Sequence, residues 1–366
     1  MSKGESNHQK KNTFPMQGST AHLKQIRRNT ITHEFDQNLP AEMLLAQESD
    51  DQLSGASQLL RQGIQHQQAG ELLAALKSLK QSLEMFQVVA DVQQQEQALS
   101  YLALVTYASG DYKSVIYYCQ QCLALKKDTP DLLVHMQALS HLGNAYRHLN
   151  DYEKAVEYLE KCLKIAQKLQ DKRSQVAVLN NLGLVYKASG NFVRAIEYQE
   201  QSLKIVRELQ DKWGIEQVLK NLGNAWYALD DYPKAIAYYE KCVKISRSLN
   251  NLRSATQVLK NLGNACYAIS NYAKAIIYYE ERLQLAKELK DKRSEEQSLG
   301  SLGVACEALG DYAKAIIYYE ERLQLARTIK DRRIEEQALA SLKVACYALG
   351  DYAKAIKYQQ GTSTNK

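Results

Sequence analysis

One pattern recurs every 40 residues from about residue 55 onward, and it restricts the possible folds more than any other feature. The dipeptide Leu-Gly occupies the same place in five successive copies, with no insertion between them: Leu142-Gly143, Leu182-Gly183, Leu222-Gly223, Leu262-Gly263 and Leu302-Gly303. The segment YAKAIIYYEERLQLA also occurs twice without change, from Tyr272 and from Tyr312. A fixed period of roughly 20–50 residues is typical of a stacked repeat protein, whose units bury their apolar faces against their neighbours. Such a chain builds a long surface rather than a closed catalytic pocket.

The composition predicts a helical chain without a membrane span. Ala, Leu, Lys, Gln and Glu dominate, and they are strong helix formers, whereas only 4 Pro occur. No stretch approaches the roughly 18–20 unbroken apolar residues that a transmembrane helix needs. The beginning, MSKGESNHQKKN, is polar and does not resemble a secretory signal. The net charge of +6 is compatible with acidic partners but does not require nucleic acid.

The cysteines favour a reducing compartment. Equivalent positions of stacked helical units lie about 10 Å apart, judging from helix packing distances of roughly 8–10 Å. A disulfide needs Cα atoms within about 7 Å, so we expect reduced, buried thiols and a cytoplasmic location. The seven cysteines, most of which recur with the repeat, are Cys119, Cys122, Cys162, Cys242, Cys266, Cys306 and Cys346.

The unit from Asp291 to Lys330 predicts an antiparallel pair of helices, each of about 18 residues. Asp291 suits the N-cap of the first helix, Gly310 suits its left-handed C-cap, and Asp311 suits the next N-cap. Apolar or small residues are spaced by three and four along both helices, which indicates one buried face on each. In the first helix they are Leu299, Leu302, Gly303, Cys306 and Leu309, and in the second Tyr312, Ala315, Ile316, Tyr319, Leu323 and Leu325.

The glycine of each Leu-Gly pair lies in the middle of a predicted helix, where glycine costs about 1 kcal/mol relative to alanine. Because this cost recurs in five units, we expect a neighbouring helix to approach the backbone closely there. Small residues at one place of the second helix should serve the same packing: Ala155, Ala195, Ala235, Ala275, Ala315 and Ala355.

These residues resemble a known family. The order Leu, Leu-Gly, aromatic, Gly-Asp-Tyr, Ala, Tyr is similar to the tetratricopeptide repeat (TPR) over roughly residues 52–360. The 40-residue period resembles its long-repeat subclass, which includes the Leu-Gly-Asn adaptors, the kinesin light chains and bacterial multi-TPR proteins. The resemblance implies an all-α, right-handed superhelical solenoid of about eight helix-turn-helix units. It also implies a non-enzymatic scaffold or adaptor that binds peptide segments of partner proteins in a concave groove lined by the first helices.

We divide the chain into a basic, polar and disordered tail over residues 1–50, a solenoid over 51–360 and a disordered tail over 361–366. The units are expected to begin near residues 52, 91, 131, 171, 211, 251, 291 and 331. The last unit has a short second helix and carries Lys343 in place of the usual glycine. We interpret it as a frayed end, a shortened form of a longer chain, or a face that pairs with a second copy.

The expected groove carries long hydrogen-bond donors without acidic neighbours. Asparagine amides can bind a peptide backbone and lysine can pair with a carboxylate, so the predicted ligand is a peptide, and an acidic one fits best. In some relatives Lys and Asn hold a C-terminal carboxylate. Lys220, Asn224 and Asn261 match those places, but Gln297 and Ser301 stand where further basic residues belong. The candidate residues are Asn144, Arg147, Asn180, Asn181, Lys187, Gln217, Lys220, Asn221, Asn224, Tyr227, Gln257, Lys260, Asn261, Asn264 and Tyr267.

No pattern indicates an enzyme, a cofactor, a metal or a small-molecule substrate. Cys119 and Cys122 have metal-ligand spacing but fall at packing positions of a second helix, and no second pair follows. His135, His141 and His148 lack the i, i+4 spacing of helical metal ligands. The Gly-Asp-Tyr turns also lack the Gly-Lys-Ser/Thr ending of a phosphate loop.

Two other hypotheses remain open beside the peptide-binding scaffold. The first is a structural protein that self-assembles through its last unit. The second is attachment to nucleic acid or an anionic membrane through the basic residues of the first 30 positions, although we do not expect nucleic acid as a partner. These residues are Lys3, Lys10, Lys11, Lys24, Arg27 and Arg28.

Overall fold

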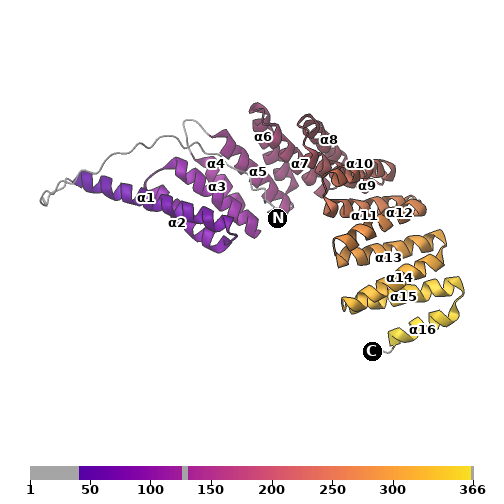
Figure 1. Ribbon diagram of the computed structural model, residues 1–366. Helices are drawn as coiled ribbons and strands as arrows, with labels where there is room; N and C mark the ends of the chain where they lie inside the picture. The colour runs from indigo at the N-terminus through magenta and orange to yellow at the C-terminus, as the bar shows by residue number, and fades with distance from the viewer. Residues whose placement is uncertain (1–40, 126–130, 364–366) are drawn as a thin grey trace, which may run out of the picture. The chain divides into compact units, whose positions relative to one another are not determined.

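The computed structural model describes residues 41–125 and 131–363, and every regular element within them is an α-helix (Figure 1). One compact unit comprises residues 49–366. The helices of the described ranges are α1 (Ala41–Gln68), α2 (Leu72–Val88), α3 (Val92–Ser109), α4 (Tyr112–Ala124), α5 (Leu132–His148), α6 (Tyr152–Lys168), α7 (Lys172–Ala188), α8 (Phe192–Glu208), α9 (Lys212–Ala228), α10 (Tyr232–Ser248), α11 (Leu252–Ala268), α12 (Tyr272–Glu288), α13 (Lys292–Leu309), α14 (Tyr312–Thr328), α15 (Arg332–Leu349) and α16 (Tyr352–Ser363).

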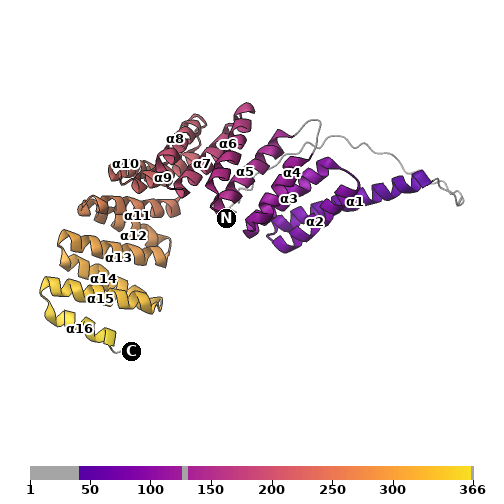
Figure 2. The ribbon, with the colours of Figure 1, turned by 180° about the vertical axis from the view of Figure 1, so that it is seen from behind.

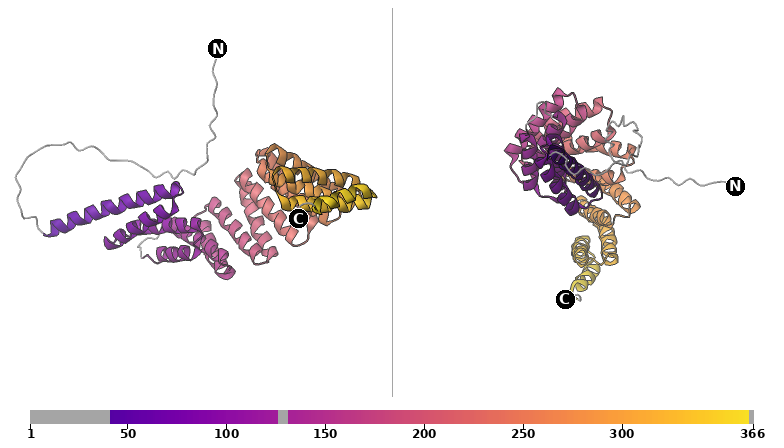
Figure 3. Two further views of the ribbon diagram at one scale, coloured as in Figure 1. Left: turned by 90° about the horizontal axis from the view of Figure 1, so that it is seen from below. Right: turned by 90° about the vertical axis from the view of Figure 1, so that its left-hand side faces the viewer.

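The helices form consecutive pairs, and each helix from α2 onward packs against the one that follows it (Figures 1 and 2). We call the odd-numbered helices first helices and the even-numbered helices second helices. First helices of neighbouring units also touch, as α9 and α11 do, and α11 and α13. The eight pairs α1–α2 to α15–α16 confirm the predicted solenoid of helix-turn-helix units, whose stacking two further views show (Figure 3).

Short polar turns set the length of each helix. From α3 to α15 every helix follows an Asp or Asn whose side chain accepts a hydrogen bond from a backbone N–H of the first turn. Asp291 accepts from the N–H of Ser294 at 3.1 Å, and Asp311 accepts from that of Lys314 at 3.0 Å. Gly310 ends α13 with a φ of 83°. The caps predicted for this unit are therefore confirmed.

The mid-helix glycines lie where a second helix presses on a first helix, as predicted. A Cβ on Gly223 would come within 2.5 Å of the Tyr239 ring, and one on Gly143 within 2.5 Å of Leu159 Cγ. The equivalent neighbour of Gly303 is the Tyr319 ring. Because real Cβ atoms do not approach other atoms so closely, glycine provides the space that these side chains fill.

The remaining packing predictions hold with one exception. The alanines of the second helices, from Ala155 to Ala355, are all at most 1% exposed. Leu299, Leu302 and Cys306 are buried, but Leu309 is 52% exposed. Leu309 is the last residue of α13 and precedes the turn, so the second helix does not cover it.

The ends of the repeat region differ from the expected boundaries. α1 begins at Ala41, so residues 41–50 extend a helix and do not belong to the tail assigned to 1–50. Ala, Glu, Gln and Leu, which favour helix, dominate this stretch. α16 likewise continues to Ser363, past the expected boundary at residue 360. The basic residues of the first 30 positions lie outside the described residues.

The exposure of the last unit bears on the hypothesis of self-association. Ile356 is 50% exposed, whereas its equivalents Ile276 and Ile316 are 7% and 4% exposed. Self-association through this face stays a prediction.

All seven cysteines are buried and unpaired with one another, which agrees with the expected packing role. Burial raises the pKa of the Cys119 thiol to about 12, so this thiol stays protonated at neutral pH. None of the described helices is both long and apolar enough to cross a membrane.

Candidate functional site

The candidate site lies on the face of the first helices, where most of the predicted groove residues gather in two hollows. The first, which we call the polar hollow, measures about 360 Å³ and involves α7, α9, α10 and α11. Six of the predicted residues line it, together with Tyr239, which the sequence did not indicate. Its lining residues are Lys187, Asn224, Tyr227, Tyr239, Gln257, Asn261 and Asn264.

Hydrogen bonds within and between units orient the asparagines of the polar hollow. The Tyr239 hydroxyl donates to Oδ1 of Asn224 at 2.8 Å, and Nδ2 of Asn261 donates to the same oxygen at 3.0 Å. Tyr279 donates to Oδ1 of Asn264 at 2.7 Å in the same way. Burial raises the pKa of both tyrosines, so both remain donors at neutral pH. The amide NH₂ groups of Asn224 and Asn264 make no hydrogen bond within the described part of the chain and can donate to a ligand.

Seven of the predicted residues line neither hollow. Some are held by local contacts: Asn144 donates to the Ser140 carbonyl at 3.1 Å, and Asn180 accepts from the Ser202 hydroxyl at 3.0 Å. Asn221 donates to Gln199 at 3.4 Å. The sequence thus did not separate residues that open on a hollow from those that bind their own scaffold, and the binding role of this face stays a prediction. The seven are Asn144, Arg147, Asn180, Asn181, Gln217, Lys220 and Asn221.

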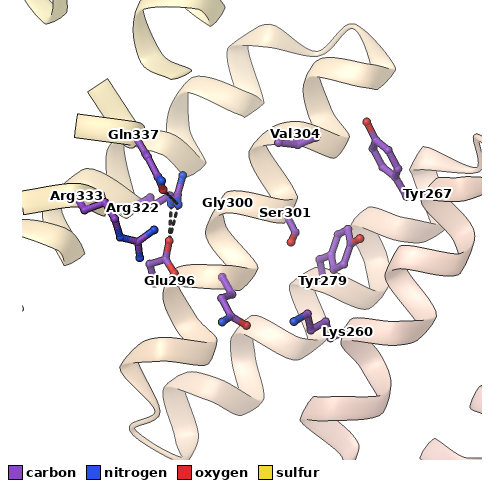
Figure 4. A pocket seen from close by; sticks show the side chains of 11 residues that line it. Lys260, Tyr267, Tyr279, Glu296, Gly300, Ser301, Val304, Arg322, Arg333 and Gln337 are labelled. Atoms are coloured by element: carbon purple, nitrogen blue, oxygen red, sulfur yellow. Dashed lines mark hydrogen bonds and ion pairs between the residues drawn. The ribbon is translucent and has the colours of Figure 1, made fainter. Parts of the chain in front are cut away.

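The second hollow, which we call the charged hollow, measures about 510 Å³ and opens between α11, α13 and α15 (Figure 4). Two predicted residues, Lys260 and Tyr267, contribute to it. The other lining residues are Tyr279, Glu296, Gln297, Gly300, Ser301, Val304, Arg322, Arg333 and Gln337. In Figure 4 the arginines lie on one side of Gly300 and Lys260 lies on the other.

A nearly buried ion pair forms one wall of the charged hollow. Nη2 of Arg322 lies 2.6 Å from Oε1 of Glu296, and the two side chains are only 14% and 10% exposed. The same Nη2 donates to Oε1 of Gln337 at 3.1 Å. A Cβ on Gly300 would stand 3.3 Å from the guanidinium, whereas the equivalent positions of α9 and α11 carry Lys220 and Lys260. Glycine at this position therefore leaves room for Arg322.

One unit earlier, Arg282 occupies the equivalent place without a carboxylate partner. It is 3% exposed, and it donates from Nη1 to Ser298 at 3.1 Å and from Nη2 to Oε1 of Gln297 at 3.0 Å. Its Nε has no hydrogen-bond partner in the described structure. Burial lowers the pKa of this guanidinium, and Asp291 and Glu296 oppose that effect from a distance. Thr256 stands where Glu296 stands in the next unit, 26 residues before the arginine in each case.

Several residues that the sequence analysis missed lie on second helices. Tyr239, Tyr279 and Arg322 line the hollows from positions that appeared to serve only the core, and Arg282 supports Gln297 from behind. The repeat itself carried a signal for the arginines: the place held by Cys122, Cys162, Ser202 and Cys242 becomes arginine in the next two units. A change from a small residue to arginine at a buried repeat position indicates a new polar contact.

The two tryptophans of α9 have different surroundings. Trp226 is half-buried, with the Lys234 ammonium 4.0 Å from its ring centroid, and its Nε1 has no hydrogen-bond partner in the described structure. Trp213 is 55% exposed, so it is accessible to a partner.

Stacked helix pairs with a polar face along the first helices define a helical repeat protein of the interaction type. The profile of the tetratricopeptide repeat family matches residues 135–208, 214–288 and 290–361. Because these ranges cover more than half of the chain, the chain belongs to the tetratricopeptide repeat family, as its sequence pattern predicted. A comparison with curated protein sequences finds no match.

Solved structures share the fold at low sequence identity. A STAND ATPase with a tetratricopeptide repeat sensor from Pyrococcus horikoshii is 19% identical, with a TM-score of 0.62 over 80% of this chain. This chain spans only 44% of that protein's length. A TPR repeat-containing protein from Cytophaga hutchinsonii is 15% identical, with a TM-score of 0.58, and the match covers 77% of this chain and 99% of that one. RapI is 16% identical, with a TM-score of 0.53, over 73% of this chain and 95% of its own.

Proposed function

We propose that this protein is a non-enzymatic scaffold that binds an extended segment of a partner protein along its first-helix face. The observation that carries the proposal is the polar hollow, where residues of three successive units turn side-chain donors toward one open space. An interaction role agrees with the tetratricopeptide repeat family to which the chain belongs. The buried thiols suit a reducing compartment, so we place the protein in the cytoplasm.

The chemistry of the polar hollow fits a peptide backbone. The oxygens of Asn224 and Asn264 already accept hydrogen bonds from tyrosines, so their NH₂ groups remain to donate to carbonyl oxygens of a ligand. Lys187 and Gln257 are exposed beside them and form no hydrogen bond within the described residues. An extended peptide presents carbonyl groups at regular intervals, and successive units present amides at regular intervals in the same direction.

A display experiment tests the proposal. The full chain is used to select short random peptides, and their affinities are compared with the variant Lys187→Glu/Gln257→Glu, which places two negative charges in the polar hollow. Both side chains are exposed, so the variant should fold. We expect the selected peptides to lose at least about tenfold in affinity, because like charges and lost donors weaken both backbone and acidic contacts.

The matched control is Lys164→Glu/Gln284→Glu, which makes the same change of charge at exposed positions of second helices. This variant should bind the selected peptides as the wild type does. Equal affinity of all three proteins, or the same loss in both variants, would exclude the polar hollow as the binding site.

A further inference from the structure

The charged hollow has a surplus of positive charge that its own residues do not neutralise. Glu296 is the only acidic residue among those that line it, and Arg322 already binds this carboxylate. Lys260 and Arg333 form no ion pair with any residue of the described ranges. Arg282 lies behind Gln297 and adds a third cation without a bound carboxylate. A negative group that entered the hollow would therefore meet Lys260 and Arg333, with Arg282 as a further cation behind Gln297.

The two glutamines of the hollow are oriented as donors. The Gln297 oxygen accepts from Nη2 of Arg282, and the Gln337 oxygen accepts from Nη2 of Arg322. Because arginine only donates, the oxygen of each carboxamide must face its arginine, and the NH₂ group must face away from it. These NH₂ groups make no hydrogen bond within the described part of the protein. The buried arginines thus fix both glutamines in the orientation that suits an acceptor ligand.

From these contacts we infer that the charged hollow binds the carboxylate of an aspartate or glutamate side chain in the bound peptide. Lys260, Arg333, Ser301 and Gln337 line the space that it would enter (Figure 4). Gln297 also lines this space. This inference rests on the proposed function, since it assigns the acidic part of the ligand to one place on the first-helix face. Lys260 stands one repeat after Lys220, a Lys place of the carboxylate-binding relatives, whereas Arg333 and Gln337 lie outside that pattern.

A singly charged carboxylate fits better than a phosphate. Glu296 belongs to the same wall, and its paired charge still repels an anion that comes close. A phosphate group carries about −1.5 to −2 charges at neutral pH, so this repulsion is larger for phosphate than for a carboxylate. Carboxylate oxygens also match the amide and guanidinium donors in number and geometry.

The test measures binding of hexaglutamate, acetylated and amidated at its ends, to the full chain by fluorescence anisotropy. Hexaglutamine and a hexapeptide of alternating phosphoserine and serine serve as comparison ligands. We expect hexaglutamate to bind more tightly than either. The variant Lys260→Gln/Arg333→Gln should lower the affinity for hexaglutamate by at least about tenfold, since it removes the two positive charges that face the hollow.

The control Lys164→Gln/Arg293→Gln removes one lysine and one arginine charge at exposed positions outside the hollow. It should change the affinity for hexaglutamate by less than about twofold. Similar losses of affinity in both double variants would show that hexaglutamate is attracted by the overall positive charge, and this would overturn the assignment. Wild-type affinity in both double variants would also overturn it. If the phosphoserine peptide binds more tightly than hexaglutamate, the ligand of the hollow is a phosphate and the assignment to a carboxylate is wrong.

The variant Gln297→Glu is the sharper test of the oriented amide. A carboxylate at this position should pair with Arg282, so the fold is retained, but it removes one donor and repels the ligand. We expect it to abolish hexaglutamate binding, whereas Gln297→Met should weaken it only in part. If Gln297→Glu binds hexaglutamate as the wild type does, the inference is wrong.

The outcome is distinguishable from that of the proposed function. If peptide selection fails but hexaglutamate still depends on Lys260 and Arg333, the anion site stands and the backbone-binding role of the polar hollow falls. The selected peptides could instead depend on the polar hollow, carry no excess of acidic residues and bind Lys260→Gln/Arg333→Gln with wild-type affinity. In that case the backbone-binding role of the polar hollow stands and the anion site falls.

Discussion

The central region around the polar hollow, residues 172–268, and the C-terminal region around the charged hollow, residues 272–349, use one scaffold for different chemistry. In the central region Tyr239 and the asparagines share neutral hydrogen bonds across units. In the C-terminal region Arg282 and Arg322 replace the small buried residue, and their hydrogen-bond acceptors are glutamines and Glu296. The contrast shows that a buried position on a second helix decides what the first helices present to a ligand.

The contrast also has an energetic side. A neutral network between buried groups is stable once its hydrogen bonds are formed, whereas a buried cation requires a carboxylate or several acceptors. Arg322 has a carboxylate and Arg282 has only neutral acceptors. We therefore expect the C-terminal region to respond more strongly than the central region to changes of charge.

The largest effect is expected when Glu296 is replaced by threonine, which gives Arg322 the surroundings of Arg282. Removal of one partner of a buried ion pair lowers the free energy of unfolding by about 3–5 kcal/mol. Because both side chains are partly exposed, we expect a loss of stability near the lower limit. Amide hydrogen exchange of α13 to α15 in the full chain measures it, because stacked units open locally.

The reciprocal variant Thr256→Glu should stabilise the helices one unit earlier, α11 to α13, by supplying the carboxylate that Arg282 lacks. The control Glu321→Thr removes an exposed carboxylate that lies 3.3 Å from the Lys287 ammonium, and it should leave exchange unchanged. Unchanged exchange in Glu296→Thr would mean that the ion pair contributes nothing to the difference between the regions.

The next effect concerns the two kinds of neighbour that the mid-helix glycines have. Gly303→Ala forces a methyl group against the rigid Tyr319 ring and should destabilise the protein by about 1–3 kcal/mol. Gly183→Ala in the central region meets the Gln199 amide, which is buried but whose hydrogen bonds to Asn180 and Asn221 are long, at 3.3 and 3.4 Å, so it yields more easily than a tyrosine ring. There the better helix propensity of alanine, up to about 1 kcal/mol, should dominate. Thermal unfolding of both variants would show opposite shifts, and equal shifts would contradict this explanation.

Alkaline unfolding should begin in the C-terminal region. Burial and then a carboxylate acceptor raise the pKa of three tyrosines above the ordinary value of 10. Above pH 10 the unfolded chain loses these protons and the folded chain keeps them, so their stabilisation is complete below pH 10 and declines above it. The pairs are Tyr278 with Glu240 at 2.8 Å, Tyr318 with Glu280 at 2.6 Å and Tyr358 with Glu320 at 2.7 Å.

Circular dichroism between neutral pH and strongly alkaline pH checks this expectation. Replacement of all three tyrosines by phenylalanine should reduce the loss of helix above pH 10. The central equivalent Tyr198, whose pKa burial and its neighbours raise to about 12, donates to Glu160 at a longer 3.3 Å. Tyr198→Phe should therefore change the loss of helix above pH 10 by less than the triple variant does. A larger change in Tyr198→Phe would contradict the expectation that alkaline unfolding begins in the C-terminal region.

The smallest effect should be the same in both regions. Gln210 and Lys290 end second helices with φ values of 53° and 54°, a conformation that costs a non-glycine residue roughly 1–2 kcal/mol. Glycine removes this strain but adds freedom to the unfolded chain, so each substitution should stabilise by at most about 1 kcal/mol. Chemical denaturation would measure both, and a marked difference between them would show that the turns also distinguish the regions.

Periodicity made the fold predictable in detail. The helix pairs, their aspartate caps and the crowded glycines follow from contacts within one unit or with the next, which the repeat displays many times. The same argument found six residues of the polar hollow. It did not find Arg282 and Arg322, because a residue that departs from the repeat gains its role from partners 15 to 26 residues away on neighbouring helices.

The sequence by itself determined the helical unit and its stacking in a repeat, because these depend on a spacing of 3.6 residues per turn and a period of 40 residues. Only the tertiary structure decided which amides are free to donate, which arginine has a carboxylate and where the face opens into a hollow. Those properties depend on distances of a few ångströms between side chains of different units, and a sequence pattern does not contain them.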